Sequence, residues 1–205
     1  MFSKNLKRKD NIIIAAIDLL DEAGIRGMTT KEIARRQNIT EPAIYRQFAS
    51  KKEIILTILQ KFSDFDQSIN NTVTEQKMKC MDGIRFFMNA YAEYYQNYPQ
   101  IATVILSYDM FHYDDETNKT MKKIINDRRK FVAGIIKKGQ SLNEFSKDIS
   151  SEDAADIITG IIWSTTYSWK MQDCNFSLKQ KFSKILDQCI GSWACTNAKT
   201  VGSEK

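Results

Sequence analysis

The stretch that decides the fold is MTTKEIARRQNITEPAIYRQFASKKEII, residues 28–55. Within it, Thr29 is followed three residues later by Glu32. This spacing is typical of a capping box, in which the hydroxyl accepts from the third amide of a helix and the carboxylate reaches back to the cap. It predicts a short helix that opens at Thr29 and ends at Gln37.

A turn and another short helix follow. Residues 38–40 form the turn, and Thr40 caps a third helix from Glu41 to Phe48. Two short helices joined by a three-residue turn form the helix-turn-helix arrangement, whose second helix enters the major groove of DNA. We therefore expect a helix-turn-helix over residues 29–48.

Helices flank this motif on both sides. Residues 10–23 place apolar side chains on one face, and Gly24 is suited to end that helix. On the other side, Ser50 and Glu53 form a second capping box, which predicts a long helix to about Gln67. Four helices in so short a stretch leave very short loops, so the packing is tight.

The outward face of the third helix suits a DNA groove. At 100° per residue, Ile44 and Phe48 point inward, whereas Pro42, Ala43 and Arg46 point outward. Small residues at the leading end let the helix enter a groove about 12 Å wide, and an arginine can donate to guanine O6 and N7. The alternative is a tight helical hairpin whose charges are merely solvated.

The positive charge of the chain is concentrated in its first third. Residues 1–62 carry 12 Lys and Arg against 7 acids, whereas the other 143 residues carry 18 of each sign. Such a distribution indicates a polyanion-binding module attached to a neutral body. Either nonspecific DNA contacts or plain solvation is expected for the basic residues that open the chain, Lys4, Lys7, Arg8 and Lys9.

A larger set of residues stands in a characteristic order: an alanine-rich helix ending in glycine, a Thr-led helix, a helix ending in Tyr-x-x-Phe, and Ser-Lys opening the next. The chain supplies Gly24, Thr29, Thr30, Ile33, Ala34, Thr40, Tyr45, Phe48, Ser50 and Lys51. In this order and spacing, residues 10–60 resemble the DNA-binding signature of the tetracycline-repressor (TetR) family. The resemblance implies a dimeric regulator, usually a repressor, that a small-molecule effector releases from a pseudo-palindromic operator.

The resemblance also implies roles for single residues. Thr29 or Thr30 would meet a DNA phosphate at the start of the second helix, where free amides and the helix dipole favour an anion. Tyr45 and Lys51 would bind further phosphates. Base reading would fall to Arg46 above all, and otherwise to Thr40, Glu41, Pro42, Ala43 and Gln47.

The rest of the chain also has helical periodicity. Apolar residues recur every three or four positions, with only two prolines and eight glycines. We expect an all-α protein of about nine helices, the later ones over residues 76–97, 100–112, 117–139, 151–171 and 178–193. The implied organisation is a DNA-binding domain over 1–50, a ligand-binding and dimerisation domain over 51–195, and a disordered tail over 196–205.

The last two helices are expected to form the dimer interface that the resemblance implies. The final helix is apolar over so wide an arc that it must be covered on two sides. The interface candidates are Ala155, Ile158, Ile162, Phe182, Ile185 and Cys189. The alternative is a purely intramolecular core.

Aromatic residues gather on two of the predicted helices and could line a pocket for an apolar or aromatic effector. The pocket candidates are Phe87, Tyr91, Met110, Trp163 and Tyr167. Any single ring of this kind is more often part of the core than a ligand contact.

Other classes of function find little support. His112 lies among acidic residues, but one histidine in such a loop is usually solvated, so we expect no metal and no cofactor. Catalytic motifs and long apolar runs are absent, so we expect a cytoplasmic protein that is not an enzyme. Two alternatives stay open: an architectural DNA binder without an effector, and a helical small-molecule-binding protein without operator function.

Overall fold

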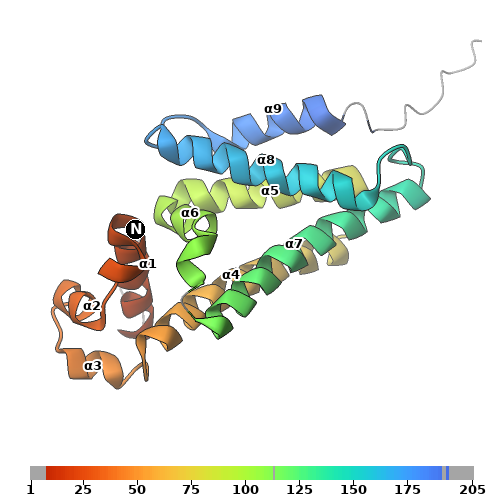
Figure 1. Ribbon diagram of the computed structural model, residues 1–205. Helices are drawn as coiled ribbons and strands as arrows, with labels where there is room; N and C mark the ends of the chain where they lie inside the picture. The colour runs from red at the N-terminus through yellow and green to blue at the C-terminus, as the bar shows by residue number, and fades with distance from the viewer. Residues whose placement is uncertain (1–7, 113, 191–192, 194–205) are drawn as a thin grey trace, which may run out of the picture.

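The structure, a computed structural model, describes residues 8–112, 114–190 and 193 (Figure 1). In this part of the chain every regular element is helical, so the all-α prediction is confirmed. Lys4, Lys7 and the 196–205 tail lie outside the described residues. The elements are α1 Arg8–Gly27, α2 Thr30–Arg36, α3 Glu41–Tyr45, α4 Lys51–Glu75, α5 Cys80–Asn97, α6 Pro99–Leu106, the 3₁₀ turn η1 Tyr108–Phe111, α7 Asp115–Ser141, α8 Ser151–Met171 and α9 Leu178–Ile190.

Helices α1 to α3 form a small unit at one end of the molecule, which we call the head (Figure 1). Helix α4 leaves the head and runs beside α7, while α5, α8 and α9 pack over them as the body. The head core consists of fully buried side chains from all three of its helices and from the start of α4, among them Ile12, Ala16, Leu20, Ile33, Ile44, Phe48 and Ile54.

Several local predictions hold, and others need correction. The Thr29 and Ser50 hydroxyls accept from the amides of Glu32 and Glu53, at 3.1 and 3.2 Å. The Glu32 carboxylate does not reach back to the cap, because it pairs with Arg35 instead. Thr40 precedes α3 at the cap position, but its side chain makes no capping hydrogen bond.

Helix lengths differ from the predictions where packing or turns decide them. Helix α4 continues past Gln67 to Glu75, because Ile69 and Val73 extend its buried face along the body. Helix α3 ends at Tyr45, because the chain tightens into a turn before Phe48. The helix predicted over residues 100–112 is divided into α6 and η1.

Polar contacts fasten the head to the body. Asp21 of α1 accepts from Thr103 of α6 and from Lys170 of α8, the latter at 2.9 Å. At the start of α4, Lys52 pairs with Asp114 at 3.2 Å and Glu116 at 2.7 Å, next to the start of α7. The first set of contacts holds the head itself, and the second holds the start of α4, which follows the head.

The kink in α1 gives a testable prediction. Gly24 has φ 64° and ψ −170°, a conformation that is essentially restricted to glycine. We expect Gly24→Ala to lower the free energy of unfolding by about 1–3 kcal/mol, measured by urea denaturation. Gly134→Ala is the control, because a methyl group at this helical position meets open space, and it should be neutral or stabilising. Equal unfolding midpoints for the two variants would contradict the prediction.

Candidate functional site: the head and a cavity in the body

The outer surface of the head carries most of the residues expected to contact DNA. Thr40, Pro42 and Arg46 are exposed, Gln47 is half-buried, and Tyr45 is 51% exposed. They lie on α3 and its two flanks, which form the second half of the helix-turn-helix. Asn38, with φ 50°, takes the left-handed conformation in the turn between α2 and α3.

Two predicted DNA contacts need correction. Ala43 is only 8% exposed, because it packs on the inner side of α3 beside Ile44 rather than on the outer face. Thr30 is also buried, and its hydroxyl donates to Glu41. The side chains of Ala43 and Thr30 are therefore poorly placed for DNA, whereas Thr29 is exposed and keeps its hydroxyl proton for donation.

Lys51 and Lys52, which are adjacent in the sequence, hold α4 to different parts of the protein. The Lys51 ammonium donates to the Ile25 carbonyl at the end of α1, and burial lowers its pKa. Lys52 points to the acids that precede and open α7. The phosphate contact of Lys51 therefore stays a prediction, and sequence reasoning missed the role of Lys52 as a tie between α4 and α7.

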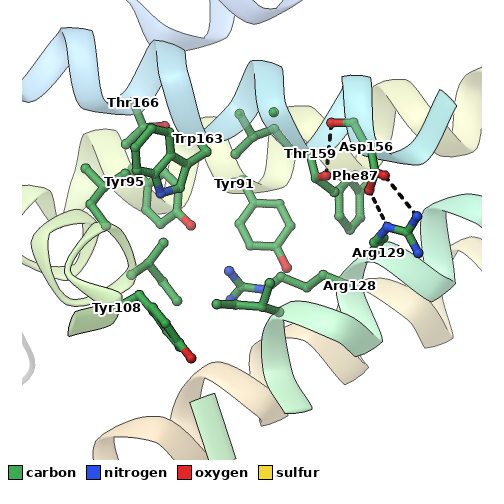
Figure 2. A pocket seen from close by; sticks show the side chains of 15 residues that line it. Phe87, Tyr91, Tyr95, Tyr108, Arg128, Arg129, Asp156, Thr159, Trp163 and Thr166 are labelled. Carbon is green, nitrogen blue, oxygen red and sulfur yellow. Dashed lines mark hydrogen bonds and ion pairs between the residues drawn. The ribbon is translucent and has the colours of Figure 1, made fainter. Parts of the chain in front are cut away.

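A cavity of about 300 Å³ lies in the body, between α5, α7, α8 and the segment that contains η1 (Figure 2). Of the residues predicted to line a pocket, Phe87, Tyr91 and Trp163 do so. The prediction that Tyr167 lines the pocket was wrong, because its ring stacks on Trp163 outside the cavity, with ring centroids 5.6 Å apart. The prediction for Met110 was also wrong, because this residue lies half-buried on η1 and is not part of the lining.

A buried ion pair borders this cavity. The Arg128 Nε donates to Asp66 Oδ2 of α4 at 2.6 Å, and these side chains are 11% and 12% exposed. The Tyr91 hydroxyl donates to the other Asp66 oxygen, and the guanidinium lies 4.8 Å from the centre of the Tyr91 ring. Burial raises the pKa of Tyr91 and Tyr95, so both hydroxyls keep their protons.

Sequence reasoning missed Arg128, although a signal existed. The buried side chains of α7 include Met121, Ile124, Val132 and Ile135. Arg128 falls four residues from Ile124 and four from Val132, on the same apolar stripe. A charged residue on such a stripe must find a partner inside the protein.

Four of the six residues predicted for the dimer interface need correction. Ala155, Ile158 and Phe182 are fully buried within one chain, and Ile162 lines the cavity, so these side chains belong to the intramolecular core. Ile185 and Cys189 are half-buried on α9 and stay candidates for an interface. An exposed neighbour that the prediction omitted is Ile157 on α8.

The acidic residues around His112 have structural roles. Asp114 accepts from the amides of Glu116 and Thr117 and caps α7, while the ring of His112 packs edge-on against Tyr108. Among the described residues, no group of three or more His, Cys, Asp or Glu is arranged to hold a metal ion. None of the described helices is both long enough and apolar enough to span a bilayer.

Comparison with known sequences identifies the family. The pattern of bacterial regulatory proteins of the tetR family matches residues 12–58, and that of the YsiA-like C-terminal region matches residues 58–192. The chain belongs to the TetR family. This TetR-family protein is a DNA-binding regulator of transcription.

Individual relatives cover nearly the whole chain. The fatty acid metabolism regulator protein of Bacillus subtilis (strain 168) is 19% identical over 180 residues, which are 87% of this chain and 92% of the relative. The structure of FadR from Bacillus subtilis in complex with stearoyl-CoA has a TM-score of 0.77 at 18% identity, and the match covers 94% of this chain and 100% of that one. The ketosteroid regulator KstR2 of Mycobacterium tuberculosis has a TM-score of 0.79 at 16% identity, covering 93% and 97%.

The buried ion pair gives a stability prediction. Asp66→Ala leaves the Arg128 guanidinium buried without its partner, so we expect it to lower the free energy of unfolding by about 3–5 kcal/mol. The matched control is Asp156→Ala on α8. This variant breaks the ion pair between Asp156, whose side chain is 53% exposed, and Arg129, whose side chain is 37% exposed. It should lower the free energy of unfolding by less than about 1 kcal/mol. Chemical denaturation measures both, and equal losses would contradict the claim that burial makes the Asp66 pair different.

Proposed function

We propose that this protein is a homodimeric regulator that reads a pseudo-palindromic operator with α3 and is released from it by a long-chain fatty-acyl thioester. In such a dimer the two α3 helices would enter successive major grooves about 34–36 Å apart. The observation that carries the effector proposal is the apolar, aromatic cavity with a buried arginine, in a chain that resembles fatty acid regulators along most of its length.

The DNA contacts follow from exposure and chemistry. Arg46 would read a base, since it is exposed just after α3 and carries a forked donor. Tyr45 and Thr29 would donate hydroxyl protons to phosphates, which fixes the position of the head without reading sequence. Thr40, Pro42 and Gln47 would border the same groove.

Replacement of Arg46 tests this assignment. We expect Arg46→Ala to weaken binding to an operator selected from random duplexes by about 1–3 kcal/mol and to relax the preference at one base pair. Arg35→Ala is the control, because it removes the same charge from an exposed position on α2 that is already paired with Glu32. It should weaken binding slightly and equally for all sequences. Electrophoretic mobility shifts on the selected site and its single-base variants measure both, and unchanged base preference in Arg46→Ala would exclude Arg46 as a reader.

The cavity suits the acyl part of such an effector. Its volume lies at the lower end of the range for ligand pockets, and rings and aliphatic side chains form most of its wall. Trp163 lines the cavity while half of its surface stays exposed, so the cavity reaches the molecular surface beside α8. The large polar part of an acyl-CoA would lie outside, near Arg129 and Asp156.

Release of DNA would follow from a shift of α4. Helix α4 begins in the head and is bound through Asp66 to Arg128 on the cavity wall. A ligand that occupies the cavity would favour a different position of α7 relative to α4, and the equilibrium between DNA-binding and released dimers would move accordingly.

Long-chain acyl-CoA should stabilise the protein and release it from DNA. A ligand at a concentration of 100 times its dissociation constant raises the free energy of unfolding by about 2.7 kcal/mol. For a chain of this size, this corresponds to a rise in Tm of about 5–10 °C. Palmitoyl-CoA should produce this rise and free CoA should not. A thermal melt and a mobility shift on the same samples measure both effects.

A narrowed cavity is the control for this experiment. Gly160 of α8 lines the cavity and has open space where a side chain would stand. Gly160 is exposed where it lines the cavity, so Gly160→Phe should narrow the mouth of the cavity and weaken the response, while Gly134→Phe, at an exposed position of α7 outside the lining, should leave it intact. If palmitoyl-CoA has no effect on the unmodified protein, the proposed effector class is wrong and the DNA-binding function is unaffected.

A further inference from the structure

Three polar atoms of the cavity wall lack a hydrogen-bond partner among the described residues: Tyr95 Oη, Arg128 Nη2 and Thr166 Oγ1. Tyr95 and Thr166 are each 1% exposed. They come from α5, α7 and α8, and all three side chains border the same space (Figure 2). The tyrosine hydroxyl and the guanidinium point toward the middle of that space from opposite walls.

Such atoms are unusual in a folded protein. Most buried polar groups are hydrogen-bonded, because leaving one unpaired costs its full desolvation penalty. Three in one cavity indicate that the wall is shaped for a polar group of a bound molecule. Arg128 Nη2 can only donate, so this group must include an acceptor.

The charges around the cavity indicate whether the acceptor group is charged or uncharged. Arg128 is already neutralised by Asp66, whose two oxygens accept from Arg128 and from Tyr91. At the edge, Arg129 is neutralised by Asp156, with 2.9 Å between Nη2 and Oδ2. A buried carboxylate would add an unmatched negative charge at high cost, whereas an uncharged oxygen would not.

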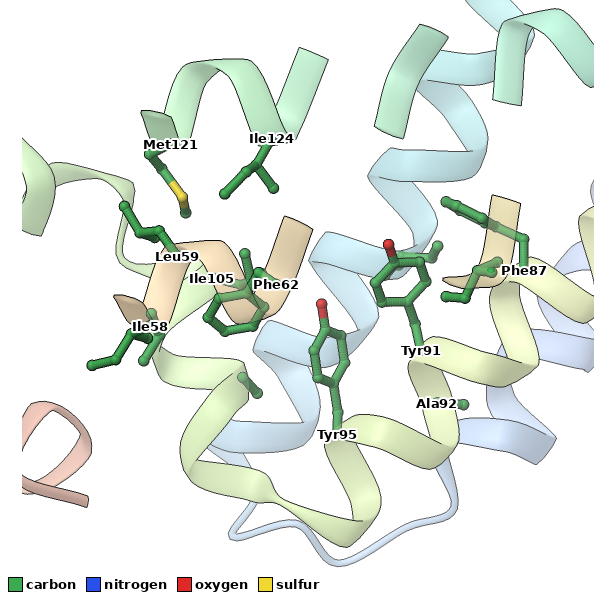
Figure 3. Close-up of a cluster of buried hydrophobic side chains, with 14 of the residues drawn as sticks. Ile58, Leu59, Phe62, Phe87, Tyr91, Ala92, Tyr95, Ile105, Met121 and Ile124 are labelled. Carbon is green, nitrogen blue, oxygen red and sulfur yellow. The ribbon is translucent and has the colours of Figure 1, made fainter. Parts of the chain in front are cut away.

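We infer that Arg128 and Tyr95 bind an uncharged carbonyl oxygen of the effector, which Thr166 helps to enclose. This inference rests on the proposed function and identifies the part of an acyl thioester that the protein recognises: the carbonyl oxygen beside sulfur. The apolar chain then packs against the neighbouring rings, among them Phe87 (Figure 3).

The position of Arg128 links recognition to α4. Its Nε holds Asp66 of α4, while its unpaired Nη2 remains available to the ligand. A carbonyl bound at Nη2 therefore pulls on the same rigid, planar guanidinium that anchors α4. The ligand needs no direct contact with α4 to affect it.

Three ligands test the inference, two of which differ only at the carbonyl. Isothermal titration calorimetry would compare palmitoyl-CoA with its hexadecyl thioether, which lacks only the carbonyl oxygen, and with palmitate, which carries a charged carboxylate. We expect the thioether to bind at least tenfold more weakly, because Arg128 Nη2 stays unpaired. Equal affinity of thioester and thioether would overturn the inference, as would tighter binding of palmitate.

Removal of the Tyr95 hydroxyl tests the residue assignment. Tyr95→Phe should leave the unfolding midpoint unchanged or raise it. It should weaken the binding of palmitoyl-CoA about three- to tenfold and have little effect on the binding of the thioether. Tyr94→Phe is the matched control, since Tyr94 is the preceding residue of α5 and lies outside the cavity lining. Its affinities should be those of the unmodified protein.

The outcomes separate the two proposals. If thioester and thioether bind equally and Gly160→Phe weakens both, the effector class stands and the carbonyl inference falls. If Tyr95→Phe weakens both ligands alike, its hydroxyl does not contact the carbonyl and the inference falls. If none of the three ligands binds, the effector class and the inference fall together.

Discussion

The arrangement of the body depends on one buried ion pair, Arg128 with Asp66. It joins α7 to α4 where the two helices lie side by side, and it orders the Tyr91 hydroxyl on the third helix of the group. Both side chains are largely buried, so the loss of either partner would leave a buried charge uncompensated. Asp66 therefore links the helix that leaves the head to two residues of the cavity wall, Arg128 and Tyr91.

The head could be predicted from sequence in detail because its signals are local. Cap residues, turn residues and helical periodicity act within a few positions, and Thr29 and Ser50 indeed cap α2 and α4. Side-chain contacts that the cap and turn signals do not specify decided the exceptions. Ala43 and Thr30 turn inward because α3 packs against α2, and Glu32 prefers a neighbouring arginine to the cap amide.

The body was harder to predict because periodicity shows that a helix face is apolar but not what covers it. Phe182 and Ile158 lie under their own chain, although an apolar stripe would look the same at a dimer interface. Phe87 was predicted for the cavity, whereas Tyr95 was not, because a hydroxyl without a partner is visible only in three dimensions. Arg128 was missed because a lone charge in a sequence is usually solvated.

The neighbouring ties of Lys51 and Lys52 restrict how α4 moves. One fixes the first turn of α4 to α1 and the other fixes it to the acids around the start of α7, so sliding along the helix axis would break both. A rotation about this turn would keep both contacts, so the turn would act as the pivot of the shift in α4 that we propose. Asp66 lies about 21 Å along the helix from Lys52, at 1.5 Å per residue. Because α3 lies closer to this pivot than Asp66 does, a displacement of α4 at Asp66 would produce a smaller displacement at α3. In this arrangement α4 works as a lever with its long arm in the body.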